Sequence, residues 1–133
     1  MFERFARICQ IEQGMRRARD EHGLHRLLFI GLGKNILPYW LGARACGLEV
    51  VAIADDRLAG GRYRGIPIVS EAVARRLEFD AAIISNSSPV HAADAARRWR
   101  RLDDRPVFDL IEPLWSAGEQ AARRLGQDVE LAA

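Results

Sequence analysis

Lysine, cysteine and long apolar runs are scarce in this sequence of 133 residues. Lys34 is the only lysine, so nearly all of the 20 basic residues are arginines. The two cysteines, Cys9 and Cys46, are too few for a disulfide framework and lack the spacing of metal ligands. No run approaches the roughly 18 apolar residues that a membrane span needs, and the charged N-terminus lacks the apolar core of a signal peptide. We therefore expect a cytoplasmic protein that contacts no membrane and holds no metal.

Net charge and composition further limit the class of protein to which this chain can belong. The formal net charge of +2 is too small to indicate binding to nucleic acid. With 49% apolar and 29% charged residues, the composition is that of a folded protein with a buried core. The sequence contains neither an internal repeat nor a low-complexity linker, so we expect residues 1–133 to form one domain.

Short apolar segments alternate with helical patterns along the chain. The segment RLLFIGLG, at 26–33, is continuously apolar, as is typical of a strand buried on both faces of a sheet. Similar segments predict further strands at 48–56, 66–69, 79–85 and 105–111. Helices are expected at 1–22, at 36–46, directly after Ser70, from about residue 89, and at 113–126.

This alternation predicts an α/β fold in which helices cover both faces of a five-stranded parallel sheet. Right-handed crossovers favour the strand order 3-2-1-4-5 of a Rossmann-like domain. Its core would span 26–111, with the N-terminal helix (1–22) and the C-terminal helix (113–126) as additions. Ligands of such sheets bind beyond the carboxyl ends of the strands, where the order reverses between the first and fourth strands.

The loop after the first strand is a candidate phosphate site. Gly31 and Gly33 let a phosphate approach the backbone, and the positive end of the following helix dipole attracts it. Lys34 and Asn35 are further candidates in this loop. The G-x-G-x-x-G fingerprint is incomplete because Ile36 holds the third glycine position. The alternative is an ordinary tight turn with a solvated Lys34.

An acidic pair ends the second predicted strand. Asp55 follows Gly33 by 22 residues, the spacing at which a carboxylate accepts hydrogen bonds from an adenosine ribose. Asp55 and Asp56 would repel a ribose 2′-phosphate, which favours NAD over NADP. Arg57 and the arginines of the following loop could reverse that preference. The alternative role for Asp55 is to cap the turn.

The segment after the fourth strand completes the predicted cofactor site. Ser85, Ser87 and Ser88 offer hydroxyl groups, and Pro89 and His91 lie where the next helix begins beside the cleft. No G-x-S-x-G elbow surrounds the serines, and we assign no catalytic residue. In the same helix, RRWRR (97–101) has the composition of a nucleic-acid patch, but helical spacing places Trp99 on the apolar face and predicts that it is core.

Three stretches resemble the nucleotide domain of the glucose–fructose oxidoreductase and inositol dehydrogenase family. They are GLGKNILPYWLGARACGLEVVAIADD (31–56), SNSSPVHAADAA (85–96) and RPVFDLIEPL (105–114). The resemblance implies a Rossmann-like domain that binds NAD or NADP. That family carries a Glu-Lys-Pro motif whose lysine contributes to hydride transfer, whereas here Glu112 is followed directly by Pro113. The resemblance therefore covers the cofactor half and leaves the dehydrogenase half without a match.

A second resemblance points to other ligands. The aspartates after the second strand and the later Gly65-Ile66-Pro67-Ile68 are similar to small Rossmann-like domains of nucleotide-sugar acetyltransferases. CoA-binding and redox-sensing domains share this turn. The resemblance implies a nucleotide sugar, CoA or NAD as the ligand.

Three hypotheses follow. The first is a stand-alone nucleotide-binding module, with NAD(P) as ligand and a regulatory or accessory role beside a separate catalytic chain. The second is a sugar- or polyol-linked oxidoreductase or a nucleotide-sugar-binding enzyme subunit, and the third is an interaction domain that has lost its ligand.

We also expect a homodimer through the two terminal helices, because each carries an apolar face. The faces consist of Phe2, Phe5, Ile8, Ile11 and Met15 on the first helix and of Leu114, Trp115, Ala122 and Leu125 on the last. The alternative is that both helices pack on each other and on the sheet of their own chain.

Overall fold

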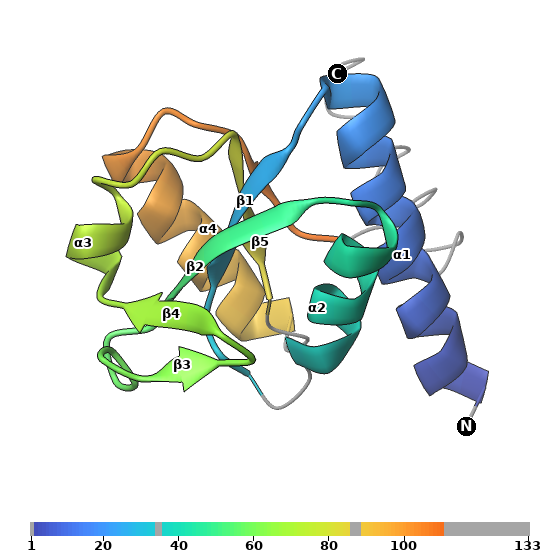
Figure 1. The fold of residues 1–133 in the computed structure, drawn as a ribbon, viewed down its shortest axis with the longest axis horizontal. Coiled ribbons are helices and arrows are strands. Elements are labelled where there is room, and N and C mark those ends of the chain that lie inside the picture. Colours follow the sequence, from blue (N-terminus) through green and yellow to red (C-terminus); the bar gives the residue numbers. More distant parts are fainter. Residues whose placement is uncertain (1, 34–35, 86–88, 111–133) are drawn as a thin grey trace, which may run out of the picture.

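The computed structural model describes residues 2–33, 36–85 and 89–110 of the chain, with the backbone alone for residues 2–8 and 89. The predicted C-terminal helix at 113–126 lies outside these residues. The elements follow one another (Figure 1) as α1 (Phe2–His22), β1 (Arg26–Ile30), α2 (Ile36–Ala45), β2 (Glu49–Ala54), β3 (Arg62–Tyr63), β4 (Ile66–Val69), α3 (Glu71–Ala74), β5 (Ala81–Ile84), α4 (Pro89–Leu102) and β6 (Val107–Phe108).

The sheet has six strands in the order β3-β4-β2-β1-β5-β6. Strands β4, β2, β1, β5 and β6 pair in parallel, and they lie within the five predicted segments in the predicted spatial order. The prediction of a purely parallel, five-stranded sheet is nevertheless wrong, because β3 adds a sixth strand antiparallel to β4. The protein is therefore an α/β protein with a mixed, mostly parallel sheet.

The additional strand β3 lies in a segment that we expected to be a loop. Arg64 and Gly65 both have positive φ, at 48° and 82°, and they reverse the chain between β3 and β4. Two-residue hairpin turns of this kind need positive φ at both central residues, which is why Asn-Gly is their usual sequence. Arg-Gly is not such a signal, so the sequence pattern did not predict the hairpin.

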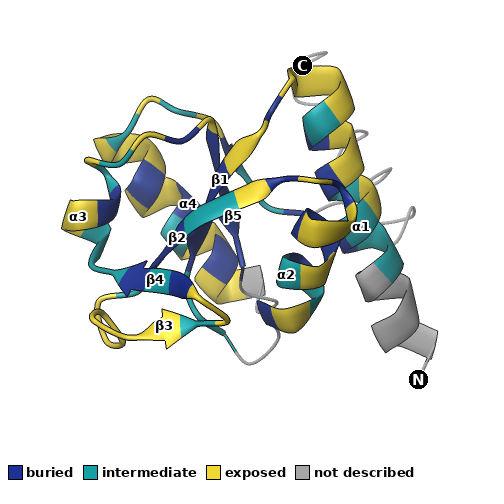
Figure 2. Ribbon diagram, viewed as in Figure 1, coloured by how far each residue is buried: buried dark blue, intermediate teal, exposed yellow. Residues whose placement is uncertain are grey.

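Helices cover both faces of the sheet (Figure 1). Helices α1 and α2 pack on one face, where Met15, Phe29 and Tyr39 belong to one buried apolar cluster. Helices α3 and α4 pack on the other face, where Ala74 and Trp99 belong to a second cluster. The buried segments of strands and helices face each other across these two interfaces (Figure 2).

The predicted N-terminal helix is present as α1 and packs against α2. Ile11 and Met15 are 2% and 0% exposed. A β-carbon on Gly42 of α2 would lie 3.4 Å from Cγ of Met15 and 3.6 Å from Cγ2 of Ile11. These are ordinary van der Waals distances, so the two helices are in contact at this position. The C-terminal part of the apolar stripe of α1 is thus covered by the chain itself.

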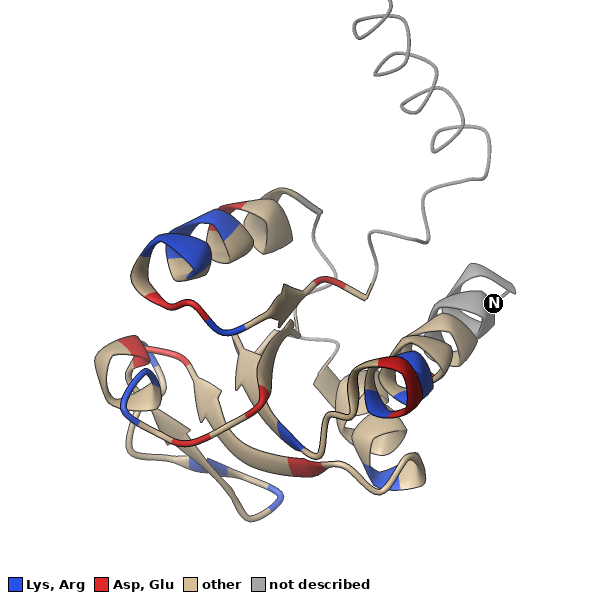
Figure 3. Ribbon diagram, turned by 90° about the horizontal axis from the view of Figure 1, so that it is seen from above, with Lys and Arg blue, Asp and Glu red and all other residues tan. Residues whose placement is uncertain are grey.

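Helix α4 confirms the interpretation of RRWRR. Trp99 is 1% exposed, and Ala92 and Ala96 on the same face are also buried. The arginines on both sides of Trp99 are exposed, and Figure 3 colours these positions of α4 blue. None of the helices that the structure describes has the length and apolar character needed to cross a membrane.

Candidate functional site

The strand register brings predicted site residues into one row. The last residue of β1, Ile30, pairs with the last residues of β2 and β5. Gly31, Asp55 and Ser85 therefore leave the sheet at the same level. Gly31 has a φ of +87° and donates its N–H to the carbonyl of Ala54 at 2.9 Å. Glycine is the residue that adopts this conformation without strain, so it suits the turn that ends β1.

The Asp55 carboxylate is bound to the backbone through both oxygens. Its Oδ1 accepts the N–H groups of Arg57 and Leu58, at 3.0 and 3.1 Å. Its Oδ2 accepts the N–H of Leu32 at 3.1 Å, which ties the loop after β1 to the loop after β2. The turn-capping role is therefore present. A carboxylate has about four lone-pair sites, so about one remains for a ligand.

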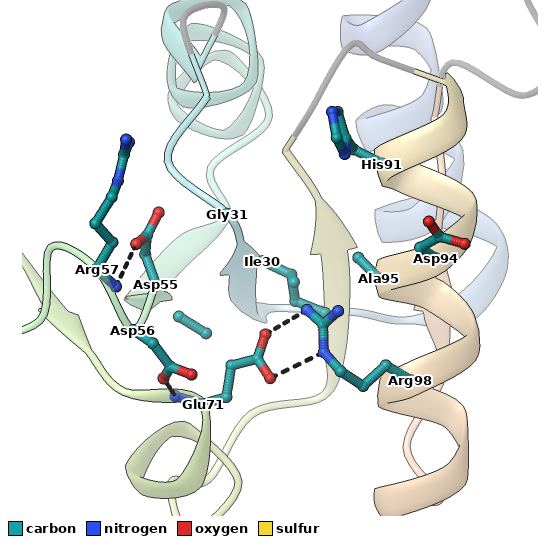
Figure 4. A pocket seen from close by; sticks show the side chains of 11 residues that line it. Ile30, Gly31, Asp55, Asp56, Arg57, Glu71, His91, Asp94, Ala95 and Arg98 are labelled. Carbon is teal, nitrogen blue, oxygen red and sulfur yellow. Dashed lines mark hydrogen bonds and ion pairs between the residues drawn. The ribbon is translucent and has the colours of Figure 1, made fainter.

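A cleft of about 550 Å³ lies beside this row, between the end of β2 and helix α4 (Figure 4). Arg57 and His91 lie on its opposite walls. The full lining consists of Ile30, Gly31, Ala54, Asp55, Asp56, Arg57, Glu71, His91, Asp94, Ala95 and Arg98. A volume of several hundred cubic ångströms is typical of sites for small molecules and cofactors.

An ion pair joins the two walls of the cleft (Figure 4). Arg98 of α4 donates from Nε to Oε2 of Glu71 at 3.1 Å and from Nη2 to Oε1 at 2.5 Å. Glu71 begins α3, and its backbone N–H donates to Oδ1 of Asp56 at 2.8 Å. The Glu71 carboxylate raises the pKa of Arg98, which keeps the guanidinium charged. These contacts connect the segment after β2, α3 and α4 across one end of the cleft.

Carboxylates outnumber cations in the cleft. The lining includes four carboxylates and two guanidinium groups. Glu71 is paired with Arg98, and Asp94 with Arg97 on the same helix. Excess negative charge disfavours a phosphate inside the cleft. Ligand hydroxyl and N–H groups, in contrast, find acceptors there.

The structure brings five of the predicted residues together, because Gly31, Asp55, Asp56, Arg57 and His91 all line the cleft. These residues come from the ends of β1 and β2 and from the first turn of α4. The sequence spacing that suggested a ligand site at the end of β1 therefore does correspond to a cleft at that position.

Other predicted residues lie elsewhere. Ser85 is 0% exposed, and its hydroxyl lies 3.1 Å from the carbonyl oxygen of Ile30 and 2.5 Å from that of Gly31. Its hydroxyl fastens β5 to β1 and does not line the cleft, and Gly33 does not line it either. Four predicted residues fall outside the described part of the chain: Lys34, Asn35, Ser87 and Ser88. Pro89 is described by its backbone alone, as the first residue of α4.

Three charged residues of the cleft, Glu71, Asp94 and Arg98, were missed by the sequence analysis, which named only His91 among the cleft residues on α4. His91, Asp94 and Arg98 follow one another at three- and four-residue steps, so one face of α4 carries them. That spacing was available in the sequence once the buried face around Trp99 was assigned. Glu71 had no comparable signal, because its contact with Arg98 joins residues 27 positions apart.

Within the part of the chain that the structure describes, no three His, Cys, Asp or Glu side chains are placed to hold a metal ion. Comparison with known proteins adds no candidate: no protein-family model, curated protein or solved structure matches the chain. The geometry of the cleft therefore carries the functional argument.

Proposed function

We propose that the protein is a nucleotide-binding module with NAD as its ligand. The observation that carries this proposal is the cleft where Gly31 and Asp55 lie side by side at the ends of β1 and β2. Strands β2 and β4 extend the sheet on one side of β1, and β5 and β6 extend it on the other. Open α/β sheets bind their ligands at such a reversal.

The charge distribution supports a particular orientation of the ligand. The nucleoside, which is neutral, occupies the acidic cleft and donates a ribose hydroxyl to the free lone pair of Asp55. The pyrophosphate lies at the rim of the cleft, beside Gly31 and the loop that follows it. NADP carries its additional phosphate on the ribose, so Asp55 and Asp56 would repel it. NAD is therefore the favoured dinucleotide.

A regulatory or accessory role suits this cleft better than catalysis. As far as the chain is described, the lining holds no lysine, serine or cysteine that would serve as a nucleophile. The resemblance to the oxidoreductase family also lacks a match for the hydride-transfer lysine. We therefore propose that the module reports on NAD or delivers it to a separate catalytic chain.

A thermal-shift screen followed by calorimetric titration tests the proposal. A ligand present at a hundredfold excess over its Kd stabilises the folded state by about 2.7 kcal/mol, so NAD should raise the melting temperature measurably. NADP, CoA, S-adenosylmethionine and UDP-glucose form the comparison panel. If only CoA or only UDP-glucose raises the melting temperature, that compound and not NAD is the ligand of the cleft. If none of the five compounds shifts the transition, the domain has no nucleotide site.

A further inference from the structure

A second cluster of side chains lies on the face of the sheet opposite the cleft. Trp40 of α2 is flanked by two guanidinium groups, with Cζ of Arg44 5.0 Å and Cζ of Arg64 4.7 Å from the ring centroid. Cζ of Arg64 also lies 5.7 Å from the ring of Tyr63. We call these four residues the Trp40 cluster. Both aromatic residues pack on the apolar cluster beneath α1 and α2, whereas the floor of the cleft belongs to the other apolar cluster.

Two distant segments build the Trp40 cluster. Trp40 and Arg44 lie on α2, while Tyr63 and Arg64 belong to the hairpin of β3 and β4, whose turn points toward α2 in Figure 1. None of Arg44, Arg62 and Arg64 forms an ion pair with a described carboxylate. The positive charge of this surface is therefore uncompensated by the described part of the chain.

Stacking prepares these guanidinium groups for carboxylates. A guanidinium that lies over an aromatic ring keeps its in-plane N–H donors available, and these match the two oxygens of a carboxylate. In Arg64 the Nε donates to the Tyr63 hydroxyl at 3.4 Å, so its two Nη groups are the donors for a carboxylate. Stacking also restricts the side chain before binding, which reduces the entropy lost on association. Since both Cζ atoms lie within 5.0 Å of one centroid, they are at most about 10 Å apart. Alternate side chains of an extended strand are separated by about 7 Å, a compatible spacing.

The backbone at Arg64 gives an independent indication. Its φ of 48° lies in the left-handed region that glycine and asparagine adopt most readily. Arg64 is exposed, so core packing does not require an arginine there. Strained backbone of this kind concentrates at functional positions. The contact of the Arg64 side chain with Trp40 offers a reason for arginine at this turn.

The neighbouring surface favours a protein partner over nucleic acid. Leu37 and Leu41 continue the same stripe of α2 as Trp40 and Arg44, and they are 40% and 47% exposed. Aromatic residues beside arginines occur both in protein interfaces and in surfaces that bind single-stranded nucleic acid. Exposed leucines next to them add the apolar contacts typical of a protein interface, which phosphates and bases do not need. The adjoining leucines thus provide contacts that apolar side chains of a peptide would use.

We propose that the Trp40 cluster binds an acidic, extended segment of a partner protein. Arg44 and Arg64 bind alternate carboxylates of the segment, and an apolar side chain between or beside them packs on Leu37 and Leu41. The proposal is independent of the nucleotide cleft, because no residue of the Trp40 cluster lines it. Through this surface, a nucleotide-binding module with an accessory role would bind the protein that it serves.

Fluorescence anisotropy with defined probes tests this surface. The probes are a fluorescein-labelled peptide GDLDLEG, its amide counterpart GNLNLQG, poly-L-glutamate as a competitor, and labelled single-stranded dT12. The acidic peptide should bind and the amide counterpart should not. Arg64→Asn should weaken binding about tenfold, as expected for the loss of one charge-assisted carboxylate contact. Because asparagine tolerates positive φ, this variant should melt no lower than the wild type.

Arg101→Asn is the matched control, since it removes the same charge from an exposed position on α4. Equal weakening by Arg64→Asn and Arg101→Asn would show that only net charge matters and would overturn the proposal. The absence of binding to both the peptide and poly-L-glutamate would also overturn it. Binding of dT12 that is lost in Arg64→Asn, without binding of the peptide, would assign the surface to nucleic acid instead.

Discussion

Asp55 illustrates how one carboxylate serves two purposes. Three backbone N–H groups already donate to it, and they hold the turn after β2 and the loop after β1 in place. The proposed ribose contact uses the remaining acceptor capacity. Structural and ligand-binding effects will therefore appear together when Asp55 is replaced, and an experiment has to separate them.

Asp55→Ala should weaken NAD binding by about 1–3 kcal/mol, because ligand and backbone donors lose their acceptor. The same change should also lower the melting temperature. Calorimetric titration with NAD and with a 2′,3′-dideoxyadenosine nucleotide separates the two effects, since only NAD carries the diol. Asp104→Ala, an exposed position between α4 and β6, is the control. Equal losses for both ligands would show that Asp55 acts only through the turn.

Asp80 offers a pH-dependent prediction at the opposite end of the strands. Its Oδ2 accepts the N–H groups of Arg26 and His25, each at 2.8 Å. These bonds, with that from Arg26 the stronger cause, hold the pKa of Asp80 below its ordinary value of 3.8. A lowered folded-state pKa means that the stabilisation is present above the unfolded-state pKa and is lost as pH falls through the folded-state pKa.

Asp80→Asn should therefore lower the free energy of unfolding at pH 7 and reduce its decline below pH 4. The expected loss at pH 7 is only about 1 kcal/mol, because Asp80 is exposed and solvent screens its charge. Urea unfolding of both proteins at pH 7 and pH 3 measures the difference. An unchanged difference between wild type and variant at the two pH values would contradict the assignment.

Residues whose roles are local were predictable from sequence. Helix α3 begins directly after Ser70 as expected, and Oγ of Ser70 caps it by accepting the N–H of Val73 at 3.2 Å. The role of Ser85 was not predictable in this way. Its hydroxyl contacts a carbonyl oxygen 54 positions away in the sequence and so faces the sheet instead of the cleft. Sequence spacing placed it at the end of its strand but did not indicate the direction of its side chain.

At the scale of elements, α3 depends on contacts that reach it from elsewhere. It has four residues, too few for a helix to be stable by itself. The cap at Ser70, the contact of the Glu71 N–H with Asp56 and the ion pair of Glu71 with Arg98 hold its first turn. The position of this wall of the cleft therefore depends on α4.

Arg98→Ala should loosen α3 without unfolding the protein. The ion pair is half exposed on the arginine side, so we expect a local loss of about 0.5–1 kcal/mol. Hydrogen exchange at the amides of Ala74 and Arg75, which donate to Ser70 and Glu71, should accelerate by up to about fivefold. Arg97→Ala removes a pair within α4 and should leave these amides unchanged. Equal acceleration in both variants would show that α3 does not depend on Glu71–Arg98.

Buried strands were the most predictable elements. The apolar run in β1 could be assigned to a strand because it is covered on both faces, and Leu27 through Ile30 are indeed buried. The hairpin of β3 was not predictable, because the conformation of Arg64 is stabilised by contacts with Trp40 on another element. Tertiary contacts overrode the local preference of arginine for negative φ.

At the scale of the whole molecule, the two proposed binding surfaces lie on opposite faces of the sheet. The cleft is bordered by α3 and α4, and the Trp40 cluster by α2 and the β3–β4 hairpin. A nucleotide and an acidic partner would therefore not compete for the same residues. The segment after β2 connects the two surfaces, because Asp55, Asp56 and Arg57 line the cleft and the chain then continues into β3, which carries Tyr63 of the Trp40 cluster.

The packing of α1 within the chain leaves a smaller apolar surface for the predicted homodimer interface. Ile11, Met15 and Ala18 are buried within the chain, so they do not supply a dimer interface. Phe2, Phe5 and Ile8, the remainder of the stripe, belong to the residues whose side chains are not described. Three large apolar side chains at the start of one helix would form an apolar patch of the kind that marks interaction sites. Two-fold pairing through the first turns of α1 remains our prediction.

Light scattering at micromolar concentration tests this prediction directly. A dimer has twice the chain mass of 14.9 kDa, and Phe5→Glu should return it to the monomer mass because a carboxylate in an apolar interface must be desolvated. Gln13→Glu introduces the same charge at an exposed position of α1 and should leave the mass unchanged. A wild-type mass near 14.9 kDa would overturn the dimer. The apolar stripe would then have to be covered by the protein's own chain, as Ile11 and Met15 already are.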